Sequence, residues 1–113
     1  VPAGYLCITR QHEEAYDAIE GQWLTEGPYA AIHRIMVSPD MRGSGLASEM
    51  VTLAEDLALG WGCAGLRVDT HLNNQPMLRM LEKNGFALCG IIHLIGGSED
   101  GDPRLAYEML LEP

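Results

Sequence analysis

A short glycine-containing segment, Arg42-Gly43-Ser44-Gly45, has the composition of a loop that binds an anion. It follows an apolar, β-branched run that ends at Val37 and a Ser38-Pro39-Asp40 turn, and a helical pattern begins at Leu46. Backbone N–H groups at the start of a helix carry a partial positive charge, and glycine lacks the Cβ atom that would keep a phosphate away. The segment therefore predicts a site for a phosphate or diphosphate group.

The same local sequence also suits a helix that simply begins after a flexible glycine segment, so the loop alone leaves both interpretations open. Two familiar phosphate-binding loops do not match it. No Gly-Lys-Ser/Thr follows, which excludes a nucleotide P-loop, and a third glycine at the spacing of dinucleotide-binding folds is missing.

The elements around this loop alternate between strand and helix patterns. Strands are expected over residues 1–8, 29–37, 66–70, 86–95 and 105–111, and helices over 12–20, 46–59 and 74–84. A strand–helix–strand order implies a right-handed crossover between parallel strands, and the last two strands form a hairpin. The predicted fold is therefore α/β, with a mixed sheet and two main helices.

Length and composition limit the classes of protein. The 113 residues predict one domain over 1–113, and the net charge of −9 argues against nucleic acid or an anionic membrane as a partner. The apolar runs are shorter than a bilayer span and no secretory signal opens the chain, so we expect a cytoplasmic protein. Three widely spaced cysteines fit reduced thiols, and no metal site is expected.

Two further patterns accompany the loop. Arg42-Gly43-Ser44-Gly45-Leu46-Ala47 resembles the acetyl-CoA loop of GNAT superfamily N-acetyltransferases, Gln/Arg-x-x-Gly-x-Gly/Ala, at every specified position. The segment from Asn74 to Phe86 resembles the family pattern Asn-x-x-Ala-x-x-x-Tyr-Glu-Lys-x-Gly-Phe, with Met77 in place of Ala and Leu81 in place of Tyr. The strand end over 35–40 is similar to apolar-x-Val-x-Pro-Glu, so the resemblance extends over about residues 29–111.

The resemblance implies a fold, an activity and a set of binding residues. GNAT enzymes transfer an acetyl group from acetyl-CoA to a primary amine by direct attack, and their sheet splays apart after the strand that precedes the loop. Main-chain groups of that strand would contact pantetheine, the loop would hold the pyrophosphate, and the asparagine helix would touch the cofactor arm. The residues concerned are Ile35, Met36, Val37, Arg42, Gly43, Ser44, Gly45, Leu46, Ala47 and Asn74.

The resemblance fails at the general acid. The tyrosine of the second pattern usually protonates the leaving thiolate in the family, and Leu81 cannot donate a proton. Tyr107 on the last strand, Cys89 and solvent are the alternatives, and Tyr107 is our candidate.

His33 is the candidate general base. It lies four residues before Val37, where relatives often carry a carboxylate, and an imidazole suits proton removal from an ammonium near neutral pH. A histidine that only packs or hydrogen-bonds within the strand is an equally good interpretation. Asp69 and His71, near the end of the next strand, are the other candidates.

The segment before the loop is shorter than the family pattern implies. GNAT enzymes usually begin with a strand, two helices and another strand, which form much of the acceptor pocket. We expect this chain either to be the central and C-terminal part of a longer protein or to receive the missing wall from a partner chain, for example in a homodimer. The acceptor would be a small-molecule or peptide amine. The rival interpretations are a catalytically degenerate CoA-binding or regulatory module and an unrelated phosphate-binding α/β domain.

Overall fold

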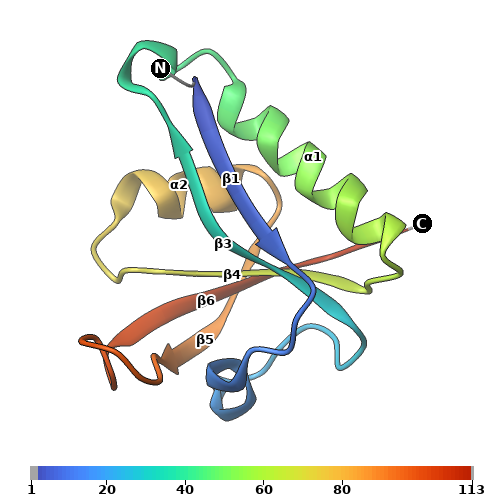
Figure 1. Cartoon of the computed structure of the whole chain (residues 1–113), viewed down its shortest axis with the longest axis vertical. Helices are drawn as coiled ribbons and strands as arrows, with labels where there is room; N and C mark the ends of the chain where they lie inside the picture. Colours follow the sequence, from blue (N-terminus) through green and yellow to red (C-terminus); the bar gives the residue numbers. More distant parts are fainter. Residues whose placement is uncertain (1–2, 113) are drawn as a thin grey trace.

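The computed structural model describes residues 3–112 and has a mixed α/β fold. The elements are β1 (Gly4–Thr9), η1 (Glu14–Ala18), β2 (Glu20–Gly21), β3 (Tyr29–Val37), η2 (Pro39–Met41), α1 (Leu46–Gly60), β4 (Gly65–Thr70), α2 (Gln75–Lys83), β5 (Ala87–His93) and β6 (Pro103–Leu110). The predicted fold class, a mixed sheet with two main helices, is confirmed (Figure 1).

Before β3, the structure differs from the predicted elements at three places. The first strand is β1, and residues 1 and 2 of its expected range lie outside the described residues. The expected helix over 12–20 is a five-residue 3-10 turn, η1. The two-residue strand β2 was not predicted, because a pairing as short as Glu20 with Ile91 and Gly21 with Gly90 leaves no alternating pattern.

The six strands form one sheet in the order β1-β3-β4-β6-β5-β2. Among residues 3–112, only β3 and β4 pair in parallel, and α1 forms the crossover between them, as the strand–helix–strand pattern predicts. The predicted hairpin of β5 and β6 is present. The strand β6 also pairs with β4, so it lies in the interior of the sheet.

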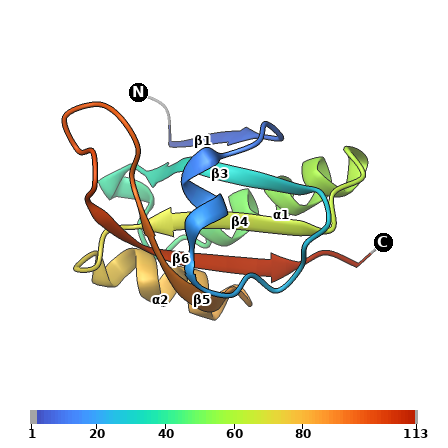
Figure 2. The ribbon, with the colours of Figure 1, turned by 90° about the horizontal axis from the view of Figure 1, so that it is seen from below.

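The two faces of the sheet are covered differently. Both helices pack on one face, where the larger core cluster includes Val51 of α1, Leu81 of α2 and Ile32 of β3. On the other face, η1 lies across the sheet and contributes Tyr16 to a smaller cluster with Ala31 and other residues (Figure 2). Burial of these apolar side chains fixes η1 and the helices to opposite faces.

Candidate active site

The parallel pairing of β3 with β4 ends before either strand does. Ile32 and Val68 are the last partners of this ladder. Beyond them β3 continues to Val37 alongside β1, and β4 continues to Thr70 alongside β6. The two strands diverge like the arms of a V (Figure 1), and between residues 33 and 37 the β4-facing edge of β3 has no strand partner among residues 3–112.

A β-bulge marks the same point. Cys7 pairs with Arg34 and Ile8 with Ile32, so His33 is left without a partner on β1. An extra residue shifts the alternation of side chains between the two faces of a strand. Ile32 and Ile35 consequently both belong to the core cluster beneath the helices, although their positions differ by an odd number.

The loop that follows β3 presents free amide groups at the start of α1. Gly43 and Gly45 have φ values of 81° and 87°, a left-handed conformation that other residues adopt only with strain. In the described part of the chain, the N–H groups of Gly43, Gly45, Ala47 and Ser48 have no hydrogen-bond acceptor. These amides and the helix dipole make the loop an anion-binding geometry.

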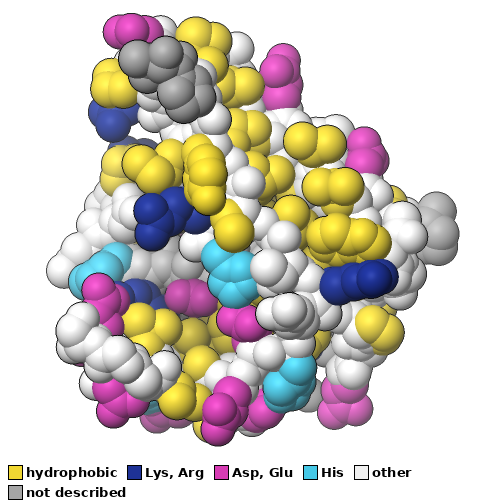
Figure 3. All heavy atoms as spheres, viewed as in Figure 1, with side chains coloured by type: hydrophobic (Ala, Val, Ile, Leu, Met, Phe, Trp, Pro, Cys, Tyr) yellow, Lys and Arg dark blue, Asp and Glu magenta, His cyan; other side chains and the backbone are white. Residues whose placement is uncertain are grey.

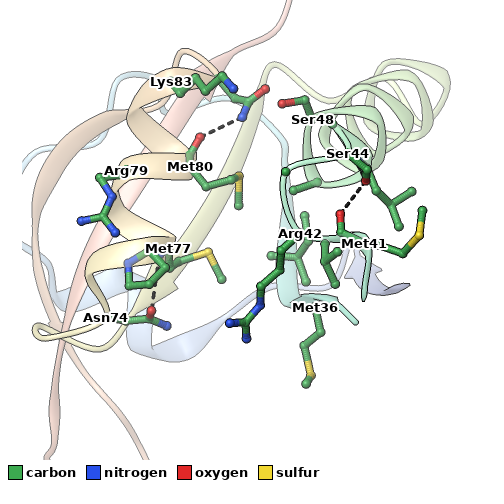
Figure 4. A pocket seen from close by; sticks show the side chains of 18 residues that line it. Met36, Met41, Arg42, Ser44, Ser48, Asn74, Met77, Arg79, Met80 and Lys83 are labelled. Carbon is green, nitrogen blue, oxygen red and sulfur yellow. Dashed lines mark hydrogen bonds between the residues drawn. The ribbon is translucent and has the colours of Figure 1, made fainter. Parts of the chain in front are cut away.

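A cleft of about 820 Å³ lies between this loop, the end of β3 and one side of α2 (Figure 4). All ten residues that the sequence assigned to the cofactor line it, while their binding role stays a prediction. The lining residues are Ile35, Met36, Val37, Met41, Arg42, Gly43, Ser44, Gly45, Leu46, Ala47, Ser48, Asn74, Pro76, Met77, Arg79, Met80, Lys83 and Asn84.

The charge of the cleft is opposite to that of the chain. Three of the seven Lys and Arg residues, Arg42, Arg79 and Lys83, line it, and no Asp or Glu does so among the described residues. The cleft therefore offers an anionic ligand both backbone amides and side-chain cations in an otherwise acidic protein.

The α2 side of the cleft is built by the asparagine motif. The Asn74 side chain accepts a hydrogen bond from the Met77 N–H at 3.3 Å, which confirms the predicted N-cap. Met77 and Met80 were expected to be core residues. They are half-buried, pack partly on the core and point toward the loop (Figure 4), so they also supply a deformable apolar surface to the cleft.

His33 lies on the face of the sheet opposite to the helices. Its Nε2 is 2.8 Å from Thr9 Oγ1, its Nδ1 is 3.7 Å from Glu13 Oε1, and 34% of its side chain is exposed. It does not line the cleft.

Tyr107, the candidate acid, pairs with Val68 where the V opens, but it does not line the cleft. Its side chain is 2% exposed and belongs to the core cluster beneath the helices, on the other face from His33. Burial and, to a smaller extent, Glu82 raise the pKa of Tyr107. Cys89 lies on β5, separated from β4 by β6, and burial raises its pKa as well.

Asp69 is the first residue of β4 beyond the last pair with β3, and it is half-buried. It accepts a hydrogen bond from the Tyr16 hydroxyl at 2.7 Å. Burial, followed by the charge of Asp69, raises the pKa of Tyr16 well above its ordinary value, which keeps the phenol protonated as a donor. The sequence did not identify Tyr16 as a site residue, because the two partners are 53 positions apart.

A buried ion pair holds the segment that carries η1 against the sheet. Arg67 Nε donates to Glu108 Oε2 at 2.9 Å, and both side chains are almost inaccessible. The other Glu108 oxygen accepts the N–H groups of Leu24 at 2.7 Å and Thr25 at 3.2 Å, and Arg67 also donates to the Thr25 carbonyl at 2.7 Å.

Aromatic side chains complete this support. The Arg67 guanidinium lies 4.1 Å from the ring centroid of Trp23 and 4.0 Å from that of Tyr29. Trp23 Nε1 donates in turn to the Tyr16 carbonyl at 2.9 Å. Besides apolar burial and the short pairing of β2 with β5, the segment between β1 and β3 is thus fixed by satisfied polar groups and by cation–π contacts.

Two classes of feature are absent from residues 3–112. No cluster of His, Cys, Asp and Glu has a geometry that could bind a metal ion. In the same part of the chain, neither α-helix combines the length and the apolar character needed to cross a bilayer.

Comparison with known proteins gives consistent relatives. A curated streptothricin acetyltransferase from Escherichia coli is 39% identical over 62 residues, which are 55% of this chain and 36% of that protein. The structure of a GNAT family acetyltransferase from Streptococcus agalactiae is 37% identical and has a TM-score of 0.77 over 98% of this chain and 60% of its own. A nourseothricin acetyltransferase that is 22% identical has the same fold, with a TM-score of 0.73 over 97% of this chain and 58% of its own.

The chain therefore spans 60% or less of the length of these relatives. The model of the acetyltransferase (GNAT) family matches residues 1–86, which include β3, the glycine loop, α1 and α2. The chain belongs to the acetyltransferase (GNAT) family.

Proposed function

We propose that the chain transfers an acetyl group from acetyl-CoA to a primary amine. The observation that carries the proposal is the V between β3 and β4, whose open β3 edge leads into a cleft lined by free amides and cations. CoA combines a phosphorylated nucleotide with an extended amide-containing arm. The loop amides and Arg42 suit the pyrophosphate, and the unpaired edge of β3 suits the arm.

In the proposed reaction the amine nitrogen attacks the thioester carbonyl carbon directly. The nitrogen of the tetrahedral intermediate loses its second proton to solvent, the carbon–sulfur bond breaks, and the products are an acetamide and the CoA thiolate. His33, at the bulge where the V opens, would remove the proton from the attacking ammonium. Because Leu81 and Tyr107 are buried in the core, the thiolate would take its proton from solvent.

The names of two relatives guide the choice of acceptor. One relative is a streptothricin acetyltransferase, and another structure is a NatC complex bound to a peptide and CoA. We propose a small-molecule amine as the acceptor, because the relative with the streptothricin name has the higher identity, 39% against 18%.

A CoA-binding module without turnover is the second candidate. It is favoured by the fully buried Leu81 at the position of the family acid and by the burial of Tyr107 in the core. This candidate predicts binding of the cofactor and no transfer.

One experiment separates these functions. Titration calorimetry with acetyl-CoA and CoA would be followed by thiol release in the presence of streptothricin, spermidine and short peptides. Transfer is supported if one amine accelerates thiol release above the hydrolysis of acetyl-CoA alone. Binding without acceleration by any of these amines would favour the module, and no binding of either ligand would exclude both.

A further inference from the structure

The two sides of the V have opposite charge. The helix side carries Arg42, Arg79 and Lys83 around the cleft, whereas the other side carries the carboxylates of Glu13 and Asp69 beside His33 and Tyr16. On the face seen in Figure 3, Asp, Glu and His side chains gather in the lower part, around the segment that contains η1. Such a separation of charge favours an anionic ligand on one side and a cationic ligand on the other.

Asp69 is placed to act on a ligand in the V. It directly follows Val68, the last residue of β4 that pairs with β3, and His33 directly follows Ile32, the partner of Val68. Both side chains lie on the face of η1, as their contacts with Tyr16 and with Thr9 and Glu13 require. One Asp69 oxygen is held by the Tyr16 hydroxyl, which leaves the other oxygen for a ligand.

The surroundings leave room for the rest of a cationic molecule. A hollow of about 470 Å³ on this face is lined by Tyr16, Asp17 and Glu26, and Asp17 is paired with His12. Asp69 and His33 do not line this hollow, but Tyr16, the hydrogen-bond partner of Asp69, does. The arginine in its wall, Arg67, is neutralised by Glu108. Among residues 3–112, the carboxylates named above outnumber the exposed Arg34, which follows the bulge.

We propose that Asp69 is a specificity-determining residue that selects a polycationic acceptor, and that Tyr16 is a positioning residue for its carboxylate. This inference rests on the proposed function, because that function makes the ligand an acetyl acceptor. One amine of the acceptor reacts beside His33, while a second, protonated amine forms an ion pair with Asp69. Tyr16 fixes the carboxylate so that the pair forms without reorganisation of the side chain.

The test compares spermidine with butylamine, which lacks the additional amines. Calorimetry would measure binding of each amine to the CoA-saturated protein, and steady-state kinetics would measure transfer to each. We expect the wild-type protein to prefer spermidine by at least about tenfold in both assays, which corresponds to about 1.4 kcal/mol.

Two variants test the proposal, and a third is the control. Asp69→Asn keeps the acceptor for the Tyr16 hydroxyl and removes the charge, so the preference should disappear while the affinity for CoA is unchanged. Tyr16→Phe should raise KM for spermidine several-fold with kcat retained, a split that a general loss of structure would not produce. Glu14→Gln, which removes an exposed carboxylate of η1 outside the hollow, should change nothing.

The outcomes distinguish the two proposals. Spermidine binding that depends on Asp69, without any transfer, would support Asp69 as the residue that selects a polycation and would exclude the proposed acetyl transfer. Transfer with equal use of spermidine and butylamine, or a preference that survives in Asp69→Asn, would overturn the inference and leave the proposed function intact. The absence of Asp69-dependent binding in the CoA-saturated protein would also overturn it.

Discussion

Ile32 of β3 and Val68 of β4 form the last pair that joins the two parallel strands. Both side chains are 2% exposed and lie in the core beneath the helices. The next residues are His33, which is exposed, and Asp69, which is half-buried. At the point where the V opens, the last pair therefore packs in the core beneath the helices, and the next residue of each strand faces the side of η1.

The glycine loop gives the most direct prediction. Gly45→Glu should raise the Kd for CoA at least about 100-fold, equivalent to about 2.8 kcal/mol, because a carboxylate would stand where the amides receive the pyrophosphate. Titration calorimetry of the folded variant would measure the change. Gly62→Glu is the matched control, since Gly62 has a φ of 79°, an equally open surrounding and a position at the other end of α1. A retained affinity in Gly45→Glu would refute the loop as the phosphate site.

The second prediction concerns the base. His33→Ala should lower kcat for amine acetylation about 100- to 10,000-fold at neutral pH, with the Kd for CoA unchanged, because His33 does not line the donor cleft. His93→Ala is the control, since His93 pairs with Glu20 at the surface and lines neither the cleft nor the hollow. Equal turnover in His33→Ala and His93→Ala would assign the base to another residue.

The third prediction concerns the buried ion pair. Glu108→Gln should lower the free energy of unfolding by about 3–5 kcal/mol, because Arg67 would keep its charge without a compensating carboxylate. Urea denaturation would measure the loss. Glu20→Gln removes the partner of His93 in an exposed pair and should change the stability by less than about 1 kcal/mol. A similar stability of the two variants would mean that the Arg67–Glu108 pair contributes little.

The fourth prediction follows from the raised pKa of Tyr16. The folded protein holds this proton more tightly than the unfolded chain, so the contribution of Tyr16 is complete below its ordinary pKa of 10.0 and is lost as the pH rises from there toward the pKa in the folded state. In that range the free energy of unfolding of the wild-type protein should fall by up to about 1.4 kcal/mol per pH unit relative to that of Tyr16→Phe. Unfolding curves from pH 8 to pH 11 would measure the difference, and parallel pH profiles would contradict it.

Features with a local cause could be predicted from the sequence. The β-branched run gives β3 with its observed limits, Tyr29–Val37, and the asparagine before a proline-containing turn gives the N-cap of α2. Nine of the ten predicted cofactor residues come together in one cleft because they belong to three consecutive segments, β3, the loop and α1. The tenth, Asn74, comes from the N-cap of α2.

Features that depend on distant contacts could not be predicted. The hydrogen bonds of Tyr16 with Asp69 and of Leu24 with Glu108 join residues 53 and 84 positions apart. The bulge at His33 leaves the composition of the strand unchanged and is visible only in its pairing with β1. Tyr107 was a candidate acid because of its residue type, but the pairing of β6 with β4 and β5 places its side chain in the core.

The interior position of β6 has a consequence for the order of folding. The strand follows both of its neighbours in the chain, yet it lies between them and carries Glu108. The N–H groups of Leu24 and Thr25 therefore gain their acceptor only after β6 has inserted, and closing loops of this length is entropically costly and slow. We expect β3, the loop and α1 to form early through short-range contacts, and the segment around η1 to dock late. The donor side of the V would then exist before the acceptor side, so a kinetic intermediate should bind CoA before it can recognise an amine.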